Sequence, residues 1–451
     1  MTDVLIIGWG KGGKTLAGTL ARAGRSVTLV EQSSAMYGGA CINVACIPTK
    51  ILVHDSQVPH GTDYDATVFA AAVDRRDTLT AAMRAKNYDM LDTVDGVTLI
   101  DGTARFVDAS TVEVATADGA TRISAETIII NTGATPTPLD LPGADGPRVH
   151  DSESIQHVDP LPKRLLVVGD GPIGLEFASM FAGFGSSVRV LSRHDRLLAR
   201  DDEDVAQVLT DVLTDAGVEI VTGAAARAFT DTGTEVTVTA EIGGETREFA
   251  ADAVLLATGR SPNTADLDLA AAGVDVDDRG AVVVDDRLRT SAPGVYAIGD
   301  VHGGPQFTYL SLDDNRILED LLLGAGDRRV SDRVAVPTTT FVTPPLARVG
   351  LSETQARERG LDVIVASTMV RDIPTLPRPK IVNNPAGIIK VVVDASSKQI
   401  LGATLFCVDS QEVVNLVALA MRHGITAPEL ASSIFTHPST SEMFNGVLAG
   451  I

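Results

Sequence analysis

The sequence predicts an α/β protein with two nucleotide-binding folds of the Rossmann type, followed by a third domain of α+β type. An apolar strand, a Gly-x-Gly-x-x-Gly turn and a helical pattern follow one another near the N-terminus, and the same order recurs after residue 164. From about Val334 the pattern changes: strands and helices continue, but no glycine fingerprint occurs. A repeated strand–turn–helix order strengthens both nucleotide-fold predictions.

The composition is that of an ordinary globular protein. The 451 residues are 44% hydrophobic and 21% charged, and at ~150 residues per domain this length suggests about three domains. The formal net charge of −22 disfavours binding to nucleic acid or to an anionic membrane. The N-terminus has no basic segment, and no apolar run approaches the ~18 residues of a membrane helix. We therefore expect a soluble cytoplasmic protein.

The first nucleotide fold is predicted from Val4 onward. A short strand over residues 4–7 leads into a glycine turn, a helical pattern over 16–24 and a second strand over 26–30. Glu31 follows that strand, about 20 residues after the turn, where an acid can accept hydrogen bonds from a ribose. The glycines let the backbone approach a pyrophosphate at the positive end of the helix. The predicted dinucleotide contacts are Gly8, Gly10, Gly13 and Glu31.

Two cysteines lie just downstream, in the segment Gly38–Lys50. Cys41 and Cys46 are five positions apart, with glycines before them and Pro-Thr-Lys after them. This pair is either a redox-active dithiol or half of a metal site. A structural zinc site needs four ligands, and Cys407 with eight scattered histidines does not supply a recognisable set. We therefore favour the dithiol, expect no resident metal, and predict that Cys407 is a buried small residue.

The rest of the first half predicts helices and short strands. A helix is expected from about Lys50, a second over 64–93, and strands within 97–115 and over 121–130. The proline-rich stretch 136–147 is typical of a linker or a domain crossing.

The second nucleotide fold begins at Arg164. A strand over 165–168, a helix over 175–184 and a strand over 187–191 surround its turn, for which the predicted contacts are Gly169, Gly171, Ile173 and Gly174. The position that corresponds to Glu31 is Ser192, which is followed by Arg193, His194 and Arg196. An acid there would repel a 2′-phosphate, whereas these basic groups suit one, so NADPH is favoured over NADH. The alternative is a solvated basic turn.

Later segments add further candidates. The stretch 254–260 is predicted to be an apolar strand that ends in a glycine turn at Gly259. The stretch 294–300 is predicted to be a strand that ends at Asp300, whose carboxylate can hydrogen-bond sugar hydroxyls. A helix is expected over 311–323 with Ser311 as its N-cap. In the third domain, strands are expected over 388–393 and 400–406, and helices over 352–360 and 411–423. A histidine such as His437 is by default a surface or core residue.

Taken together, these pieces resemble the flavin-dependent pyridine nucleotide–disulfide oxidoreductases. The markers are the two glycine fingerprints, the Cys41–Lys50 segment, Ala257-Thr258-Gly259, Gly299-Asp300 and His437-Pro438 with Glu442. Three stretches resemble the subgroup of bacterial reactive-chlorine-resistance flavoproteins and hypothiocyanous acid reductases; they begin at Ala35, Phe307 and Phe435.

The resemblance implies a homodimer in which each chain is divided into four segments. FAD is expected in residues 1–149 and the return segment 266–333, the nicotinamide nucleotide in 150–265, and the dimer interface in 334–451. Cys46 would face the flavin and Cys41 would meet the substrate. His437, oriented by Glu442, would reach the partner subunit's Cys41. Lys50 and Glu176 would form an ion pair beside the flavin. The remaining implied cofactor contacts are Gly39, Ala104, Thr132, Gly133, Asp300, Ser311 and Gly259.

The resemblance also implies a function with alternatives. Hydride would pass from NADPH through the flavin to the Cys41–Cys46 disulfide, and the dithiol would reduce a small oxidant, either hypothiocyanous acid or Cu(II). A reductase of a low-molecular-weight disulfide such as glutathione or mycothione, and a non-catalytic redox sensor, are the other hypotheses. One departure from the family is Pro172, which occupies the place of a tyrosine that covers the nicotinamide site in many relatives. We therefore expect that gate to be absent.

Overall fold

The computed structural model describes residues 2–58 and 64–451, which form two compact units. Unit 1 contains Met1–Leu52, Ala71–Thr137 and Gly259–Arg333, and unit 2 contains Val53–Ala70, Pro138–Thr258 and Val334–Ile451. The chain passes from unit 1 to unit 2 within α3 and returns within α4. It passes to unit 2 again after Thr137, inside the proline-rich segment, returns at Gly259 and leaves unit 1 for the last time after Arg333.

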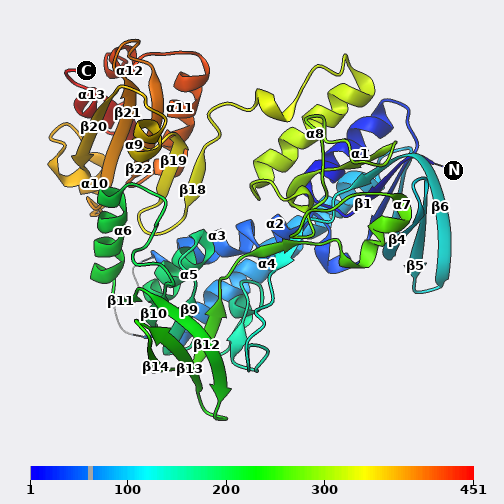
Figure 1. Cartoon of the computed structure of the whole chain (residues 1–451), viewed down its shortest axis with the longest axis horizontal. Coiled ribbons are helices and arrows are strands. Elements are labelled where there is room, and N and C mark those ends of the chain that lie inside the picture. The colour runs from blue at the N-terminus through cyan, green and yellow to red at the C-terminus, as the bar shows by residue number, and fades with distance from the viewer. Residues whose placement is uncertain (1, 59–63) are drawn as a thin grey trace. The chain divides into compact units, whose positions relative to one another are not determined.

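Unit 1 is built on a sheet whose parallel strands have the order β3-β2-β1-β6-β17. Their bounds are Val97–Asp101, Val27–Glu31, Thr2–Ile7, Gly119–Ile130 and Val295–Ala297. Successive side chains of a strand point to opposite faces, so Leu5 and Ile7 enter one core while Val4 and Ile6 enter the other. The helices α1 (Lys11–Arg22) and α8 (Thr308–Leu323) lie side by side and cover the second face (Figure 1).

Further elements complete unit 1, and two of them, the helices α3 and α4, continue into unit 2. β4 (Thr103–Asp108) and β5 (Thr111–Thr116) extend the sheet in antiparallel fashion from β6. The dithiol segment forms α2 (Ala40–Asn43) and the start of α3 (Cys46–Ser56), and α4 covers Ala66–Asp92. The remaining pieces are β7 (Ala134–Pro136), paired with β16 (Arg260–Pro262), and α7 (Leu269–Ala272).

Unit 2 contains the second nucleotide-type sheet. Its parallel strands have the order β11-β10-β9-β15-β8, with bounds Val218–Val221, Ser187–Leu191, Arg164–Val168, Ala253–Leu256 and Val149–His150. The helices α5 (Pro172–Gly183) and α6 (Glu203–Asp215) follow β9 and β10. An antiparallel sheet of β12 (Ala224–Asp231), β13 (Val236–Ile242) and β14 (Glu245–Ala251) packs its apolar face into the same core.

The C-terminal part of unit 2 is an antiparallel sheet with the order β18-β19-β22-β21-β20. The strand bounds are Thr338–Thr340, Leu346–Gly350, Ile400–Phe406, Ile388–Asp394 and Val363–Met369. The helices are α9 (Glu353–Glu358), α10 (Arg378–Ile381), α11 (Ser410–Arg422), α12 (Ala427–Ala431) and α13 (Met443–Val447). The predicted strands and helices of this domain are confirmed, and Cys407 is buried as predicted.

Several helices start earlier than predicted. The helix expected from about Lys50 begins at Cys46, and the helix expected over 175–184 begins at Pro172. The helix expected from Ser311 begins at Thr308, with Phe307 as its N-cap residue. Ser311 is therefore inside the first turn, where its hydroxyl accepts a hydrogen bond from the Gly12 amide (3.1 Å) instead of capping its own helix. The serine serves the packing of α8 against α1.

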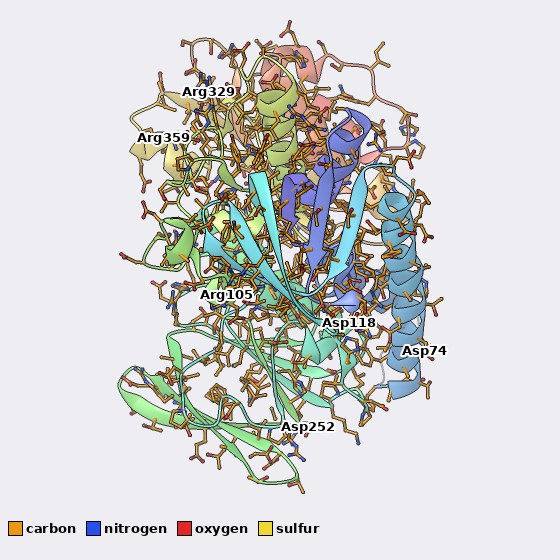
Figure 2. All side chains as sticks on the ribbon, turned by 90° about the vertical axis from the view of Figure 1, so that its right-hand side faces the viewer. Asp74, Arg105, Asp118, Asp252, Arg329 and Arg359 are labelled. Atoms are coloured by element: carbon orange, nitrogen blue, oxygen red, sulfur yellow. The ribbon has the colours of Figure 1, made fainter. Side chains whose placement is uncertain are left out.

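The outer surface carries the acidic excess of the chain. Figure 2 shows charged side chains such as Asp74, Arg105 and Asp118 directed away from the ribbon, and all three are exposed. Within the part of the chain that the structure describes, no helix combines the length and apolar character needed to cross a membrane.

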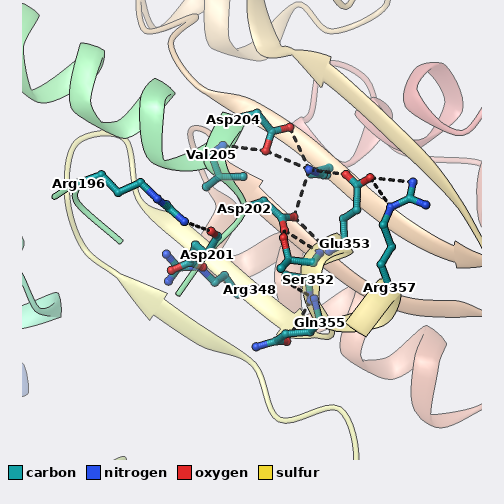
Figure 3. Close-up of polar contacts among 12 residues, drawn as sticks. Arg196, Asp201, Asp202, Asp204, Val205, Arg348, Ser352, Glu353, Gln355 and Arg357 are labelled. Atoms are coloured by element: carbon teal, nitrogen blue, oxygen red, sulfur yellow. Dashed lines mark hydrogen bonds and ion pairs between the residues drawn. The ribbon is translucent and has the colours of Figure 1, made fainter. Parts of the chain in front are cut away.

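A buried lysine ties three parts of unit 2 together. Lys390 on β21 is 4% exposed, and its Nζ lies 3.1 Å from Asp202, 3.0 Å from Asp204 and 2.8 Å from Glu353 (Figure 3). Asp202 also accepts hydrogen bonds from the backbone amide and hydroxyl of Thr354. Burial by itself would raise the pKa of Asp202. The hydrogen bonds from Thr354 and Lys390 outweigh burial and lower the pKa to about 2. The cluster therefore joins α6, α9 and β21 through charge.

Replacing Lys390 tests this cluster. Lys390→Met leaves three carboxylates without their shared cation, and we expect a loss of about 3 kcal/mol in unfolding free energy at pH 7. The ammonium lowers the pKa of Asp202 and Glu353. Without it these two groups protonate at higher pH in the folded variant, so the deficit shrinks toward pH 4. Urea unfolding of the native protein and of Lys390→Met at pH 7 and pH 4 measures the difference in unfolding free energy.

The exposed Lys380 on α10 provides the matched control, since Lys380→Met removes the same charge from solvent. That variant is expected to unfold within about 0.5 kcal/mol of the native protein at either pH. A Lys390→Met deficit that is the same at both pH values would contradict the electrostatic explanation.

Candidate active site

The two cysteines lie on separate short helical segments. Cys41 is in α2 and Cys46 is the first residue of α3. The turn before them depends on Gly39, whose φ of +80° suits glycine and whose Cβ, if present, would lie 2.8 Å from the Cα of Gly10. The dithiol segment is thus pressed directly against the first glycine turn.

The thiols have different surroundings. The Sγ of Cys46 lies 3.7 Å from the Oγ1 of Thr308, at the N-terminus of α8. A hydrogen bond with Cys46 and then burial hold the pKa of Cys41 well above its usual range, and Thr308 and the charge of Lys14 act in the opposite direction without reversing this. A helix N-terminus and a nearby cation favour a thiolate, so both thiols have a group that supports ionisation.

The first glycine turn forms a cradle. α1 begins at Lys11 without a side-chain cap from its N-cap residue. The Ser311 hydroxyl takes the Gly12 amide, and the other amides of the first turn remain positioned to receive an anion. The Nδ2 of Asn131 donates to the Gly8 carbonyl (3.0 Å), and the Asn131 side chain fills the space beside Gly10 and Gly13. A pocket at this edge of the sheet is lined by residues that include four of the predicted contacts: Gly8, Glu31, Ala104 and Thr132.

Glu31 is engaged by backbone amides. Its carboxylate accepts hydrogen bonds from the amides of Trp9 (3.0 Å) and Ser33 (3.2 Å). Burial raises the pKa of Glu31, and these bonds act in the opposite direction. The acid therefore also holds the shape of the turn. The Trp9 indole is buried and packs against Tyr37 and Tyr88, with ring centroids 4.6 Å and 6.0 Å away.

Asp300 follows β17 in a short helical turn, Gly299–His302. Burial raises the pKa of this carboxyl group. The turn is held by Asp314 of α8, which accepts hydrogen bonds from the Gly299 amide (2.7 Å) and pairs with His302 (3.3 Å). Asp314 is 1% exposed; the sequence analysis did not identify it as a support for this turn.

Other predicted contacts lie near the segment 259–263. The Thr132 hydroxyl donates to the Asn263 carbonyl (2.7 Å), and the Asn263 amide donates to the Gly133 carbonyl (2.9 Å). The carbonyl of Gly259 accepts a bond from the Thr137 amide (3.0 Å). These bonds connect the chain on both sides of β7 to the chain on both sides of β16.

The second glycine turn is crowded at two of its three glycines, Gly169 and Gly174. α5 starts at Pro172, a residue suited to the first helical position, and Ile173 follows. A Cβ on Gly174 would lie 2.2 Å from the Gly169 carbonyl oxygen, whereas the space around Gly171 is open to 4 Å. Gly171 is therefore the glycine of this turn that faces open space.

An acid lies beside two of the residues at the predicted nucleotide turn, Ser192 and His194. Asp170 accepts a hydrogen bond from the Ser192 hydroxyl (3.0 Å) and lies 3.2 Å from the Nδ1 of His194. The sequence analysis missed Asp170 because it is next to Ser192 in space and 22 residues away in the chain. Arg193 is exposed at this turn.

Arg196 is committed elsewhere. Its guanidinium donates to the carbonyls of Leu198 (3.0 Å), Ala199 (3.1 Å) and Asp201 (2.9 Å). The expectation that it joins Arg193 and His194 at a phosphate is not supported, because these bonds hold it to its own loop.

His437 and Glu442 form a contact pair in the C-terminal domain. The Nδ1 of His437 lies 2.8 Å from a carboxylate oxygen of Glu442, whose other oxygen accepts from the Ser439 amide (2.8 Å). The Ser439 bond and then His437 lower the pKa of Glu442. The imidazole is 71% exposed, so its Nε2 edge is open to a partner.

The expected Lys50–Glu176 ion pair stays a prediction, because the two residues belong to different units. Within unit 2, Glu176 is buried and one oxygen accepts a bond from the Phe341 amide (2.8 Å). Within the described ranges 2–58 and 64–451, no group of three or more His, Cys, Asp or Glu side chains is arranged to hold a metal ion.

Comparison with known protein families covers nearly the whole chain. The model described as pyridine nucleotide-disulphide oxidoreductase matches residues 2–314, and the model of the corresponding dimerisation domain matches residues 336–447. The second match indicates that the chain forms a homodimer.

Individual relatives agree with these matches. The chain is 44% identical over 448 residues to the probable pyridine nucleotide-disulfide oxidoreductase RclA of Escherichia coli strain K12, covering 99% of this chain and 98% of that protein. It is 33% identical to a mercuric reductase of Bacillus cereus over 98% of this chain and 70% of that protein. The Cu(II) complex of the HOCl-induced flavoprotein disulfide reductase RclA from Escherichia coli has a TM-score of 0.94, at 44% identity, over 99% of this chain and 98% of that one. These matches confirm the predicted fold class.

The two glycines of the second turn provide a paired test. Gly174→Ala places a methyl group against the Gly169 carbonyl, and we expect a loss of about 2 kcal/mol in unfolding free energy. Gly171→Ala meets open space at a φ of −73°, so its expected change is less than about 1 kcal/mol. Denaturant unfolding of both variants measures the difference, and equal destabilisation would contradict the packing described for this turn.

Proposed function

The chain belongs to the pyridine nucleotide-disulphide oxidoreductase family, and we therefore propose that it is an FAD-dependent reductase that uses NADPH to reduce a small reactive oxidant. Hypothiocyanous acid is the first candidate and Cu(II) the second. The observation that carries the proposal is the unequal dithiol: Cys46 starts a helix beside Thr308, and Cys41 precedes it on a separate segment.

The residues of unit 1 suit FAD. The uncapped start of α1 can receive a pyrophosphate, and the pocket at Glu31 has the acid that a ribose requires. Bound FAD would supply two-electron transfer between the nicotinamide and the dithiol. In this proposal residues 1–149 and 266–333 hold FAD, 150–265 hold NADPH, and 334–451 form the dimer interface. Asp300 and Ser311 contribute to the FAD site, with Lys50 and Glu176 paired beside the ring.

The dithiol would act in two balanced steps. The Cys41 thiolate attacks the sulfur of hypothiocyanous acid, forming a sulfenyl thiocyanate and releasing hydroxide. The Cys46 thiolate then attacks the Cys41 sulfur, which restores the disulfide and releases thiocyanate. The substrate sulfur gains two electrons and the dithiol loses two.

We assign the proton for the released hydroxide to His437 of the partner subunit. Glu442 holds the Nδ1 edge of this ring and leaves the Nε2 edge to donate, which is the arrangement of an oriented acid–base histidine. The dimerisation match makes an active site shared between subunits reasonable.

One similar protein supports a small oxidant rather than a disulfide as the substrate. The Escherichia coli protein whose structure matches this chain is HOCl-induced and was solved with Cu(II). A reductase of glutathione or mycothione disulfide remains the alternative function.

A panel of oxidants tests the function. Enzyme reduced anaerobically with NADPH is mixed in a stopped-flow instrument with hypothiocyanous acid, Cu(II), glutathione disulfide or mycothione disulfide. We expect the fastest reoxidation with hypothiocyanous acid, and its loss in Cys41→Ser because the attacking sulfur is gone. Cys407→Ala, which removes the buried third cysteine, is the control and retains the rate. Fast reduction of either disulfide would overturn the proposal.

The thiol assignment has a spectroscopic check in the same samples. Cys46→Ser should remove the long-wavelength absorbance of the two-electron-reduced enzyme, because that band needs a thiolate beside the flavin. If the band persists in Cys46→Ser and disappears in Cys41→Ser, the two roles are reversed.

The preference for NADPH depends on Arg193. Arg193→Met removes an exposed cation from the turn that carries Ser192 and His194, and we expect about a tenfold rise in KM for NADPH with little change for NADH. Steady-state kinetics with each nucleotide measures this, and Arg200→Met in the same exposed loop is the matched control. A native enzyme that prefers NADH would contradict the assignment.

A further inference from the structure

Lys14 has no role in the scheme so far. It follows the last glycine of the first turn and is part of α1. Its Nζ donates a hydrogen bond to the Oδ1 of Asn87 on α4, and the Asn87 Nδ2 donates in turn to the Met83 carbonyl (2.7 Å). That second bond fixes the amide with its oxygen toward the lysine. A neutral amide holds the ammonium in place without cancelling its charge.

The same two residues border the segment that carries Cys41. The Asn87 side chain lies 3.1 Å from where a Cβ on Gly38 would be, and Gly39 packs on Gly10 at the start of α1. On the same helix as Asn87, Arg84 donates to the Oδ1 of Asn43 (2.8 Å), the residue that ends α2. Arg84 and Asn87 of α4 therefore border the segment that carries Cys41, and Asn87 also binds Lys14 of α1.

The charges of Lys14 and Cys41 act on each other. The ammonium lowers the pKa of Cys41, and the Cys41 thiolate raises that of Lys14. Burial and then repulsion from Lys11 lower the pKa of Lys14 to about 8. Lys14 therefore remains mainly protonated at pH 7, when a thiolate at Cys41 needs a counter-charge. Cys46 and Thr308 are the other groups that face Cys41.

We propose that Lys14 is a positioning residue for Cys41: held by Asn87, its ammonium stabilises the Cys41 thiolate of the reduced enzyme and draws anionic reagents to it. The inference rests on the proposed function, in which Cys41 is the attacking thiol. Cys41 would then have a cation from its own subunit, Lys14, in addition to the histidine that we assign to the partner subunit. It also gives the site a preference for oxidants that are anionic or that release an anion.

Alkylation of the holoenzyme tests the proposal without turnover. Protein reduced with a phosphine is treated with iodoacetamide or with iodoacetate, and Cys41 modification is followed by peptide mass spectrometry. In each case the thiolate attacks carbon and iodide leaves. For Lys14→Met we expect about a fivefold slower reaction with iodoacetamide at pH 7 and a rise in the pH of half-maximal alkylation. The rate ratio of iodoacetate to iodoacetamide should also fall.

Three further variants separate charge from packing. Lys14→Arg keeps the charge and is expected to leave the rate ratio of iodoacetate to iodoacetamide unchanged. Asn87→Asp retains Lys14 but neutralises it, and should lower the ratio as Lys14→Met does, which covers the case in which Lys14→Met folds poorly. Lys86→Met removes an exposed charge from the neighbouring position of α4 and should change neither rate.

An unchanged ratio in both Lys14→Met and Asn87→Asp would overturn the inference. Because the reduction is chemical, this result is independent of the oxidant panel. Failure of the panel with a clear change in alkylation ratio would reject the proposed substrate and retain the role of Lys14.

Discussion

One backbone contact determines the arrangement of the site: Gly39 against Gly10. Any side chain at Gly39 would meet the first glycine turn at 2.8 Å, so the dithiol segment would have to move away from it. Electron and group transfer need reacting atoms in near contact. The close approach therefore links the redox pair to the nucleotide turn. The neighbouring features, Thr308 at Cys46 and Lys14 near Cys41, both depend on α2 and α3 staying there.

Two lysines of this chain show how the neighbouring acceptors determine what a buried cation does. Lys390 is surrounded by Asp202, Asp204 and Glu353, so its charge is more than balanced and serves to join elements. Lys14 has the neutral acceptor Asn87, so its charge remains available to a neighbouring thiol. The ammonium group joins secondary-structure elements in one place and is available to a thiol in the other, because of the acceptors that surround it.

The fold and the site differ in how far the sequence predicts them. The apolar run at Val4–Ile7 and the glycine spacings are local patterns, and the strands and turns they predict are present. The helix start at Thr308 was missed because Ser311 has good capping chemistry, and only the packing of α8 on α1 shows that its hydroxyl is used by Gly12. Contacts such as Asp170 with Ser192 and Lys14 with Asn87 join residues 22 and 73 positions apart. No periodicity in the sequence encodes such pairs.

Trp9 gives the first glycine turn an optical property. It is the single tryptophan of the chain, its ring is buried against Tyr37 and Tyr88, and its amide is bound to Glu31. Tryptophan emission therefore originates from one known point, at the turn where we place the cofactor, without any introduced label. The fluorescence of the native protein is in effect a local spectroscopic reporter of that turn.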